Sequence, residues 1–142
     1  MSILSRIFGW VHGLPPAQTR AVQIERDLPI PMPDGAVLLA HRYAPRGASG
    51  LPTILVRSPY GRGAMWGLIY GVPFAERGFQ VVIQSCRGTF GSGGDFDPFW
   101  KDRDDGLATV RWIREQPWFS GKLAMMGASY LGYVQWAIGA EA

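Results

Sequence analysis

The strongest structural signal in this sequence is the stretch Leu123-Ala-Met-Met-Gly-Ala-Ser-Tyr-Leu-Gly132. Its first four residues are apolar throughout, which is typical of a short strand buried on both faces of a parallel sheet. A helical pattern begins at Tyr130, so Ser129 lies at a sharp turn between strand and helix. The neighbours that give such a turn room are small: Gly127, Ala128 and Gly132. We interpret Ser129 as a candidate nucleophile at the carboxyl edge of a sheet, with a plain glycine-rich turn as the alternative for this string alone.

The residue after the serine has a predicted role of its own. The backbone N–H of Tyr130 opens the helix, where unpaired N–H groups and the helix dipole favour negative charge. A donor in this position is suited to an oxyanion that develops during acyl transfer. We therefore expect Ser129 and the Tyr130 N–H to face the same space.

The rest of the chain alternates between strands and helices. Pro33-Asp34-Gly35 is a turn signal between two strand patterns, and it predicts a β-hairpin. Helical patterns follow at 66–77, at 102–116 and from Tyr130 onward. The predicted strands are 22–31, 36–43, 53–57, 79–84 and 122–126. We expect an α/β fold with one mixed sheet, in which the last three strands are parallel and the hairpin is antiparallel at one side.

Length and composition fit one folded domain with a separate N-terminal segment. The chain has 142 residues, of which 47% are hydrophobic and 18% charged. Residues 1–14 show helical apolar spacing before Pro15-Pro16. We divide the chain into an amphipathic arm at 1–20 and a main domain at 21–142. The arm is interpreted as a segment that packs on this protein or a partner, with an interfacial membrane anchor as the alternative.

Several classes of function are excluded. The net charge is +3, but the basic residues are scattered, which predicts no nucleic-acid partner. Every apolar stretch is too short to span a bilayer as a helix. Cys86 is the single cysteine, and no CxxC or paired-histidine spacing indicates a metal site. We expect a soluble protein in the reducing cytoplasm that uses neither metal nor cofactor.

Other polar candidates have structural explanations. The glycine-rich stretch 87–94 lacks the Gly-Lys-Ser/Thr of a phosphate-binding loop, so we interpret it as a structural loop. The acids at 102–105 suit a helix N-terminus better than a cation site. Cys86 has no neighbouring histidine and is expected to be inert. His12 and His41 are both interpreted as structural residues.

Several motifs together resemble those of the X-Pro dipeptidyl peptidase and cocaine esterase family of α/β-hydrolases. The match runs from about Ile24 to the end of the chain, in order and with similar spacing. The motifs are Pro33-Asp34-Gly35, Arg57-Ser58-Pro59-Tyr60, Arg87-Gly88 with Ser92-x-Gly94-x-Phe96, Trp112-Ile113-x-x-Gln116-Pro117-Trp118 and Gly127-x-Ser129-Tyr130-x-Gly132. The sequence differs from the family pattern in having Ser85 where relatives often have an acid, and Leu131 in the fifth place of the common elbow.

The resemblance implies a serine hydrolase without cofactor. Ser129 would be the acyl-accepting nucleophile, and the Tyr60 hydroxyl would join the Tyr130 N–H in an oxyanion hole. A phenol is protonated near neutral pH and can therefore donate a hydrogen bond. The implied substrates are small esters, amides or X-Pro peptides.

The triad cannot be completed from this sequence. α/β-Hydrolases place the acid and the histidine after the serine, yet residues 130–142 contain no histidine, and Glu141 lies too far along the helix. The chain therefore resembles the N-terminal part of such an enzyme, and we expect it to be inactive alone. A generic carboxylesterase fragment and a non-catalytic module that needs a complementary chain are the alternatives. We also expect the unpaired strand to cause self-association.

Overall fold

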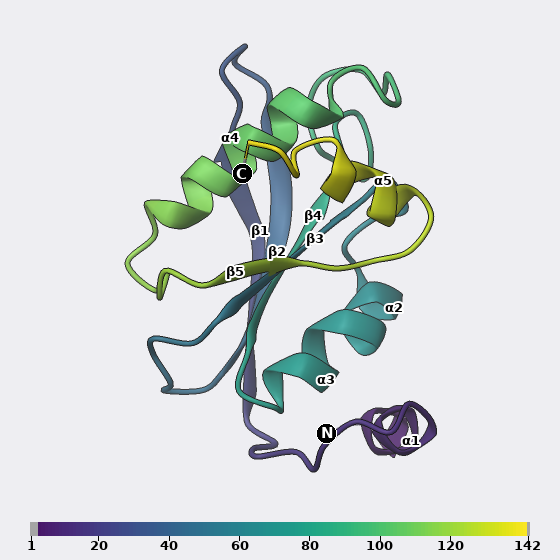
Figure 1. Ribbon diagram of the computed structural model, residues 1–142, viewed down its shortest axis with the longest axis vertical. Coiled ribbons are helices and arrows are strands. Elements are labelled where there is room, and N and C mark those ends of the chain that lie inside the picture. Colours follow the sequence, from purple (N-terminus) through teal and green to yellow (C-terminus); the bar gives the residue numbers. More distant parts are fainter. Residues whose placement is uncertain (1–2, 142) are drawn as a thin grey trace.

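A computed structural model describes residues 3–141 and shows one five-stranded sheet (Figure 1). The strands are β1 (Val22–Pro31), β2 (Val37–Pro45), β3 (Thr53–Ser58), β4 (Gln80–Ser85) and β5 (Leu123–Met125). Their spatial order is β1-β2-β4-β3-β5. β1 and β2 form an antiparallel hairpin, and β2 pairs antiparallel with β4. β3 is parallel to both β4 and β5, so the predicted mixed sheet is confirmed.

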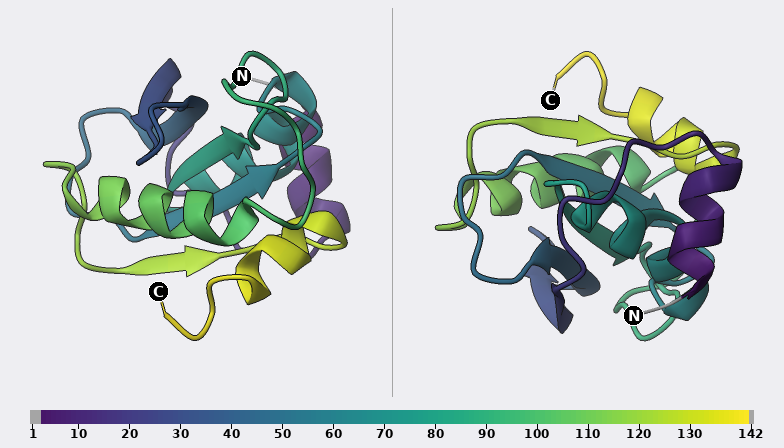
Figure 2. Two further views of the ribbon diagram at one scale, coloured as in Figure 1. Left: turned by 90° about the horizontal axis from the view of Figure 1, so that it is seen from above. Right: turned by 90° about the horizontal axis from the view of Figure 1, so that it is seen from below.

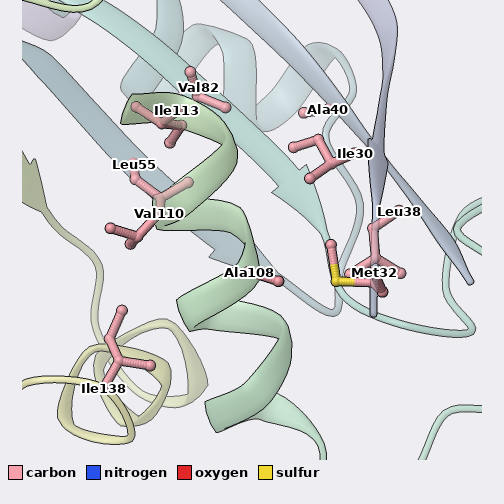
Figure 3. Close-up of a cluster of buried hydrophobic side chains, with 10 residues drawn as sticks. All are labelled: Ile30, Met32, Leu38, Ala40, Leu55, Val82, Ala108, Val110, Ile113 and Ile138. Carbon is pink, nitrogen blue, oxygen red and sulfur yellow. The ribbon is translucent and has the colours of Figure 1, made fainter. Parts of the chain in front are cut away.

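Helices cover both faces of this sheet (Figure 2). α4 (Asp102–Arg114) packs on one face, where Val110 and Ile113 meet Leu55 and Val82 in a buried cluster (Figure 3). The opposite face carries α2 (Ala64–Trp66), the π-helical turn η1 (Gly67–Gly71) and α3 (Val72–Ala75). α5 (Tyr130–Trp136) follows β5 at the end of the sheet order. β3 and β4 are buried along their whole length, as their apolar patterns predict.

Two predicted helices differ in detail from the observed ones. The segment expected to be one helix over 66–77 is interrupted by η1, because Pro73 has no N–H to donate to the preceding turn. Gly67 and Gly71 in this turn lie against the Tyr43 side chain: a Cβ at Gly67 would come within 2.3 Å of its hydroxyl oxygen, and a Cβ at Gly71 within 2.7 Å of its ring. The helix expected to run from Tyr130 to the end of the chain stops at Trp136 and continues as turns.

The N-terminal segment contains α1 (Ile3–Val11) and is attached to the main domain through Glu76. The Ser5 hydroxyl donates a hydrogen bond of 2.6 Å to Glu76 Oε2, and Arg20 Nη1 lies 3.0 Å from the same oxygen. The Glu76 carbonyl accepts from the N–H groups of Gln18 and Thr19. Among residues 3–141, no helix is both long enough and apolar enough to cross a membrane.

Candidate active site

Ser129 lies in a backbone conformation that non-glycine residues rarely adopt. Its φ is +57° and its ψ is −127°, at the junction between β5 and α5. Such strain persists only where the surrounding structure holds it, and it is concentrated at functional sites. The Ser129 side chain is exposed and its hydroxyl does not cap the helix. The hydroxyl is therefore presented outward, as a nucleophile requires.

Close packing explains the glycine before this turn. Gly127 has a φ of +137°, and a Cβ there would lie 2.4 Å from the Cβ of Leu131. Leu131 is buried in the core cluster between the sheet and helices α2 and α3, so it cannot move aside easily. Gly132 has more room, since a Cβ there would make an ordinary contact of 3.4 Å with the Gly127 carbonyl. Gln135 adds support by donating to the Gly127 carbonyl at 3.0 Å.

Tyr130 places its two donor groups in different surroundings. Its backbone N–H is in the first turn of α5, where no earlier helical carbonyl is available to it. Its phenol donates a hydrogen bond of 2.5 Å to Asp102 Oδ2 at the start of α4. Burial, and then the hydrogen bond to Asp102, raises the pKa of the phenol well above its usual range. The side chain thus anchors the residue, which leaves the N–H as its candidate catalytic group.

Asp102 is in turn bound by a fully buried arginine, Arg57. Arg57 Nη1 donates to the Asp102 carbonyl at 2.7 Å, and Arg57 Nη2 lies 3.7 Å from Asp102 Oδ1. Arg57 Nε donates to Gln84 Oε1, and Gln84 Nε2 donates to Thr109. Strands β3 and β4 and helix α4 are therefore joined below the site by one polar network.

Tyr60 follows β3 and leaves the sheet at the edge from which Ser129 leaves β5. Thr53 and Leu55 of β3 pair with Leu123 and Met125 of the parallel β5, so the carboxyl ends of both strands meet there. The Tyr60 side chain is 50% exposed. Its ring stacks on Trp66 with centroids 6.1 Å apart, and Trp66 Nε1 donates to the Tyr60 carbonyl. The described contacts of Tyr60 thus fix its ring against α2.

The remaining candidate residues have structural contacts. Burial raises the pKa of the Cys86 thiol to about 12, which fits the expected inert thiol. His41 Nδ1 accepts the Asp27 N–H at 3.1 Å, and burial lowers the pKa of His41. Arg87 of the glycine-rich loop binds both Asp105 and Asp34. The described residues contain no group of three or more His, Cys, Asp or Glu placed to hold a metal ion.

Residues 34–142 match the family described as X-Pro dipeptidyl-peptidase (S15 family), which is more than half of the chain. The chain belongs to this family. The resemblance seen in the motifs is therefore confirmed. The predicted strand–turn–helix arrangement around Ser129 is present, since Ser129 lies between β5 and α5.

Individual relatives support both the membership and the fold. Cocaine esterase from Rhodococcus sp. (strain MB1 Bresler) is 40% identical over 111 residues, which are 75% of this chain and 19% of that protein. The crystal structure of an aminopeptidase from a marine sediment Thaumarchaeota archaeon matches with a TM-score of 0.70 and 25% identity over 87% of this chain and 24% of that one. An α-amino acid ester hydrolase matches with a TM-score of 0.69 and 28% identity over 89% and 25%. The expected α/β-hydrolase fold is confirmed, and this chain spans about a quarter or less of the length of each of these relatives.

The groups that support the site were not predicted from the sequence. Asp102 was interpreted only as a helix N-terminal acid, yet it accepts hydrogen bonds from the Tyr130 phenol and from the Phe99 N–H. Arg57 and Gln135 were not singled out for this role at all. The sequence signal for Arg57 is a charged residue inside an apolar strand, where burial requires a partner. The roles of Ser129 and Tyr60 in this S15 member stay predictions.

Proposed function

We propose that this chain carries the nucleophile and the oxyanion-binding groups of a serine hydrolase that acts on esters or amides. The observation that carries the proposal is the strained backbone of Ser129 directly before the first turn of α5. This geometry exposes a hydroxyl beside an unpaired helical N–H. Membership in the S15 family supports the same chemistry.

In the proposed reaction, Ser129 Oγ forms a bond to the substrate carbonyl carbon. The carbonyl electron pair moves to oxygen, and the Tyr130 N–H and the Tyr60 O–H donate hydrogen bonds to the resulting oxyanion. The oxyanion then collapses, the bond to the alcohol or amine breaks, and water releases the acyl group from Ser129 in a second round.

A base must take the Ser129 proton and deliver it to the leaving group. Serine is a weak nucleophile without one. His41 Nδ1 accepts a hydrogen bond from the Asp27 N–H, and His12 lies just beyond α1 with its ring packed at a tilt against Phe8. We propose that the acid and histidine come from sequence outside these 142 residues, in the same or a complementary polypeptide. Residues 1–142 alone are then a non-catalytic module.

Relatives guide the choice of substrate. Cocaine esterase and the α-amino acid ester hydrolase are ester hydrolases by name, whereas the archaeal relative is named an aminopeptidase. We therefore propose an ester as the first substrate, with an X-Pro peptide as the second.

The test compares the Tyr60→Phe variant with the parent protein. Both are expressed together with the sequence outside residues 1–142 that supplies the triad histidine. Removal of one oxyanion donor is expected to lower kcat for a p-nitrophenyl ester by roughly 10²–10³, with little change in KM. Tyr70→Phe is the matched control, because the Tyr70 ring also stacks on Trp66. A Tyr60→Phe variant with unchanged kcat removes Tyr60 from the proposed site.

A further inference from the structure

α1 turns its apolar side away from the protein. Ser5 and Gly9, one turn apart, are buried against the main domain. The opposite side of the helix carries four large apolar residues that are exposed: Ile3 (69%), Ile7 (52%), Trp10 (84%) and Val11 (62%). This arrangement is the reverse of the usual one, in which the apolar face of an amphipathic helix packs on the core.

Polar contacts fix this orientation. Ser5 binds the buried carboxylate of Glu76 at 2.6 Å. A Cβ on Gly9 would lie 2.6 Å from Arg77 Nη2, so the helix and the guanidinium are in close contact, and a larger residue at position 9 would require the Arg77 side chain to shift. Arg77 Nε donates to the Pro15 carbonyl beyond the helix at 2.6 Å. Because Ser5 and Gly9 are buried, the small and polar side of α1 faces α3, the helix beside which α1 lies (Figure 1).

The charge around this face is positive. Arg6 is exposed on α1, and the chain contains no Asp or Glu before Glu25. The acid that α1 does contact, Glu76, is buried and paired with Arg20. An anionic surface can therefore approach the exposed face of α1 without meeting a negative side chain of this segment.

The size of the face argues against a second copy of the chain as its occupant. At about 60–120 Å² for each large apolar side chain, four residues offer roughly 250–500 Å², below the ~800 Å² that each partner buries in a standard stable interface. A short helix with a tryptophan, aliphatic residues and a flanking arginine has the composition of helices that lie in the lipid headgroup region.

We propose that α1 binds the surface of an anionic phospholipid bilayer through Ile3, Ile7, Trp10 and Val11, with Arg6 facing the headgroups. The protein would then be a peripheral membrane protein held by a docked helix. Of the two interpretations of residues 1–14 in the sequence, the outward apolar face favours the interfacial anchor.

Vesicle flotation tests the proposal, since floating vesicles separate bound protein from sedimenting aggregates. The chain is mixed with vesicles of phosphatidylcholine and phosphatidylglycerol, or of phosphatidylcholine alone. We expect it to float with the anionic vesicles and less with the neutral ones. Arg6→Glu is expected to weaken binding by about fivefold or more, because each basic residue near an anionic surface contributes roughly that factor.

The deciding variant is Ile7→Ser/Trp10→Ser/Val11→Ser. These side chains are exposed, so the fold should be unaffected, and bound protein should fall about tenfold or more as the apolar contact is lost. Trp100→Ser is the control, because Trp100 is 80% exposed outside α1. The proposal is contradicted if the parent does not float with anionic vesicles, or if the triple variant floats as much as the parent. It is also contradicted if Trp100→Ser no longer floats. A parent protein that is a dimer and does not float, and whose triple variant is a monomer, would also contradict the proposal, because the face would then bind a second copy.

Discussion

The Tyr130 phenol donates a hydrogen bond of 2.5 Å to Asp102, and so joins the first residue of α5 to the first residue of α4. The buried Arg57 side chain donates a hydrogen bond to the backbone carbonyl of Asp102. The start of α5 is therefore fixed from the core of the sheet. This is the element on which Ser129 and the Tyr130 N–H depend.

Tyr130→Phe should lower the free energy of unfolding by about 1–3 kcal/mol, because a hydrogen bond to a buried carboxylate is lost. Urea unfolding followed by circular dichroism measures the change. Tyr133→Phe is the matched control, since the Tyr133 phenol donates to the neutral, exposed Phe99 carbonyl. The Tyr133 change should be the smaller of the two, and equal effects would contradict the special role of Asp102.

Backbone strain at Ser129 predicts an unusual order of stability. At its φ of +57°, glycine is favoured over any residue with a Cβ, so Ser129→Gly should be more stable than Ser129→Ala by about 1 kcal/mol. The two variants are compared by thermal and urea unfolding. Ser120, which has no such φ, serves as the control, and there the alanine variant should be the more stable. An alanine variant at 129 that equals or exceeds the glycine variant would show that the turn is unstrained in solution.

His41 makes stability depend on pH. Burial lowers the pKa of folded His41 below its ordinary value of 6.5, so the unfolded chain binds the proton more readily. The stabilisation is fully present above pH 6.5 and is lost as the pH falls through and below that value. Unfolding midpoints at about pH 8 and pH 5.5 should therefore differ more for the parent than for His41→Gln, which cannot take up the proton. The same pH dependence in both proteins would assign the effect to other groups.

β5 lies at one end of the sheet order and, within residues 3–141, pairs only with β3. Ala124 in its centre is exposed, and Trp136 on α5 is exposed as well. An apolar edge strand pairs readily with other chains. We predict that residues 1–142 alone self-associate in sedimentation velocity, and that Ala124→Lys shifts them toward monomer. A monodisperse parent with strongly protected amides along 123–125 would contradict this prediction.

The sequence predicted the sheet well because its strands carry strong local signals. The apolar runs around Leu55 and Val82 admit little but buried parallel strands, and Pro33-Asp34-Gly35 marks the hairpin turn. The packing of Gly67 and Gly71 in the π-helical turn against Tyr43 on another strand was missed. Contacts between distant residues leave no periodic pattern in a sequence.

The difference between local motifs and long-range contacts also explains why Ser129 was identified from the sequence and the role of Asp102 was not. Ser129 lies in a local strand–turn–helix motif, so the sequence alone identified it. Asp102 lies 28 positions from Tyr130 in the chain, and only the fold brings the two together. The outward apolar face of α1 also depends on a tertiary contact, that of Ser5 with Glu76.

Covalent labelling tests the proposed role of Ser129 as the acyl-accepting nucleophile. The protein is expressed from its complete reading frame, treated with a fluorophosphonate and digested for peptide mass spectrometry. Labelling is predicted on Ser129, with none in Ser129→Ala and little in residues 1–142 alone, where no triad histidine follows the serine. A label on another residue of the active protein, or ester turnover that survives in Ser129→Ala, would show that Ser129 is not the nucleophile.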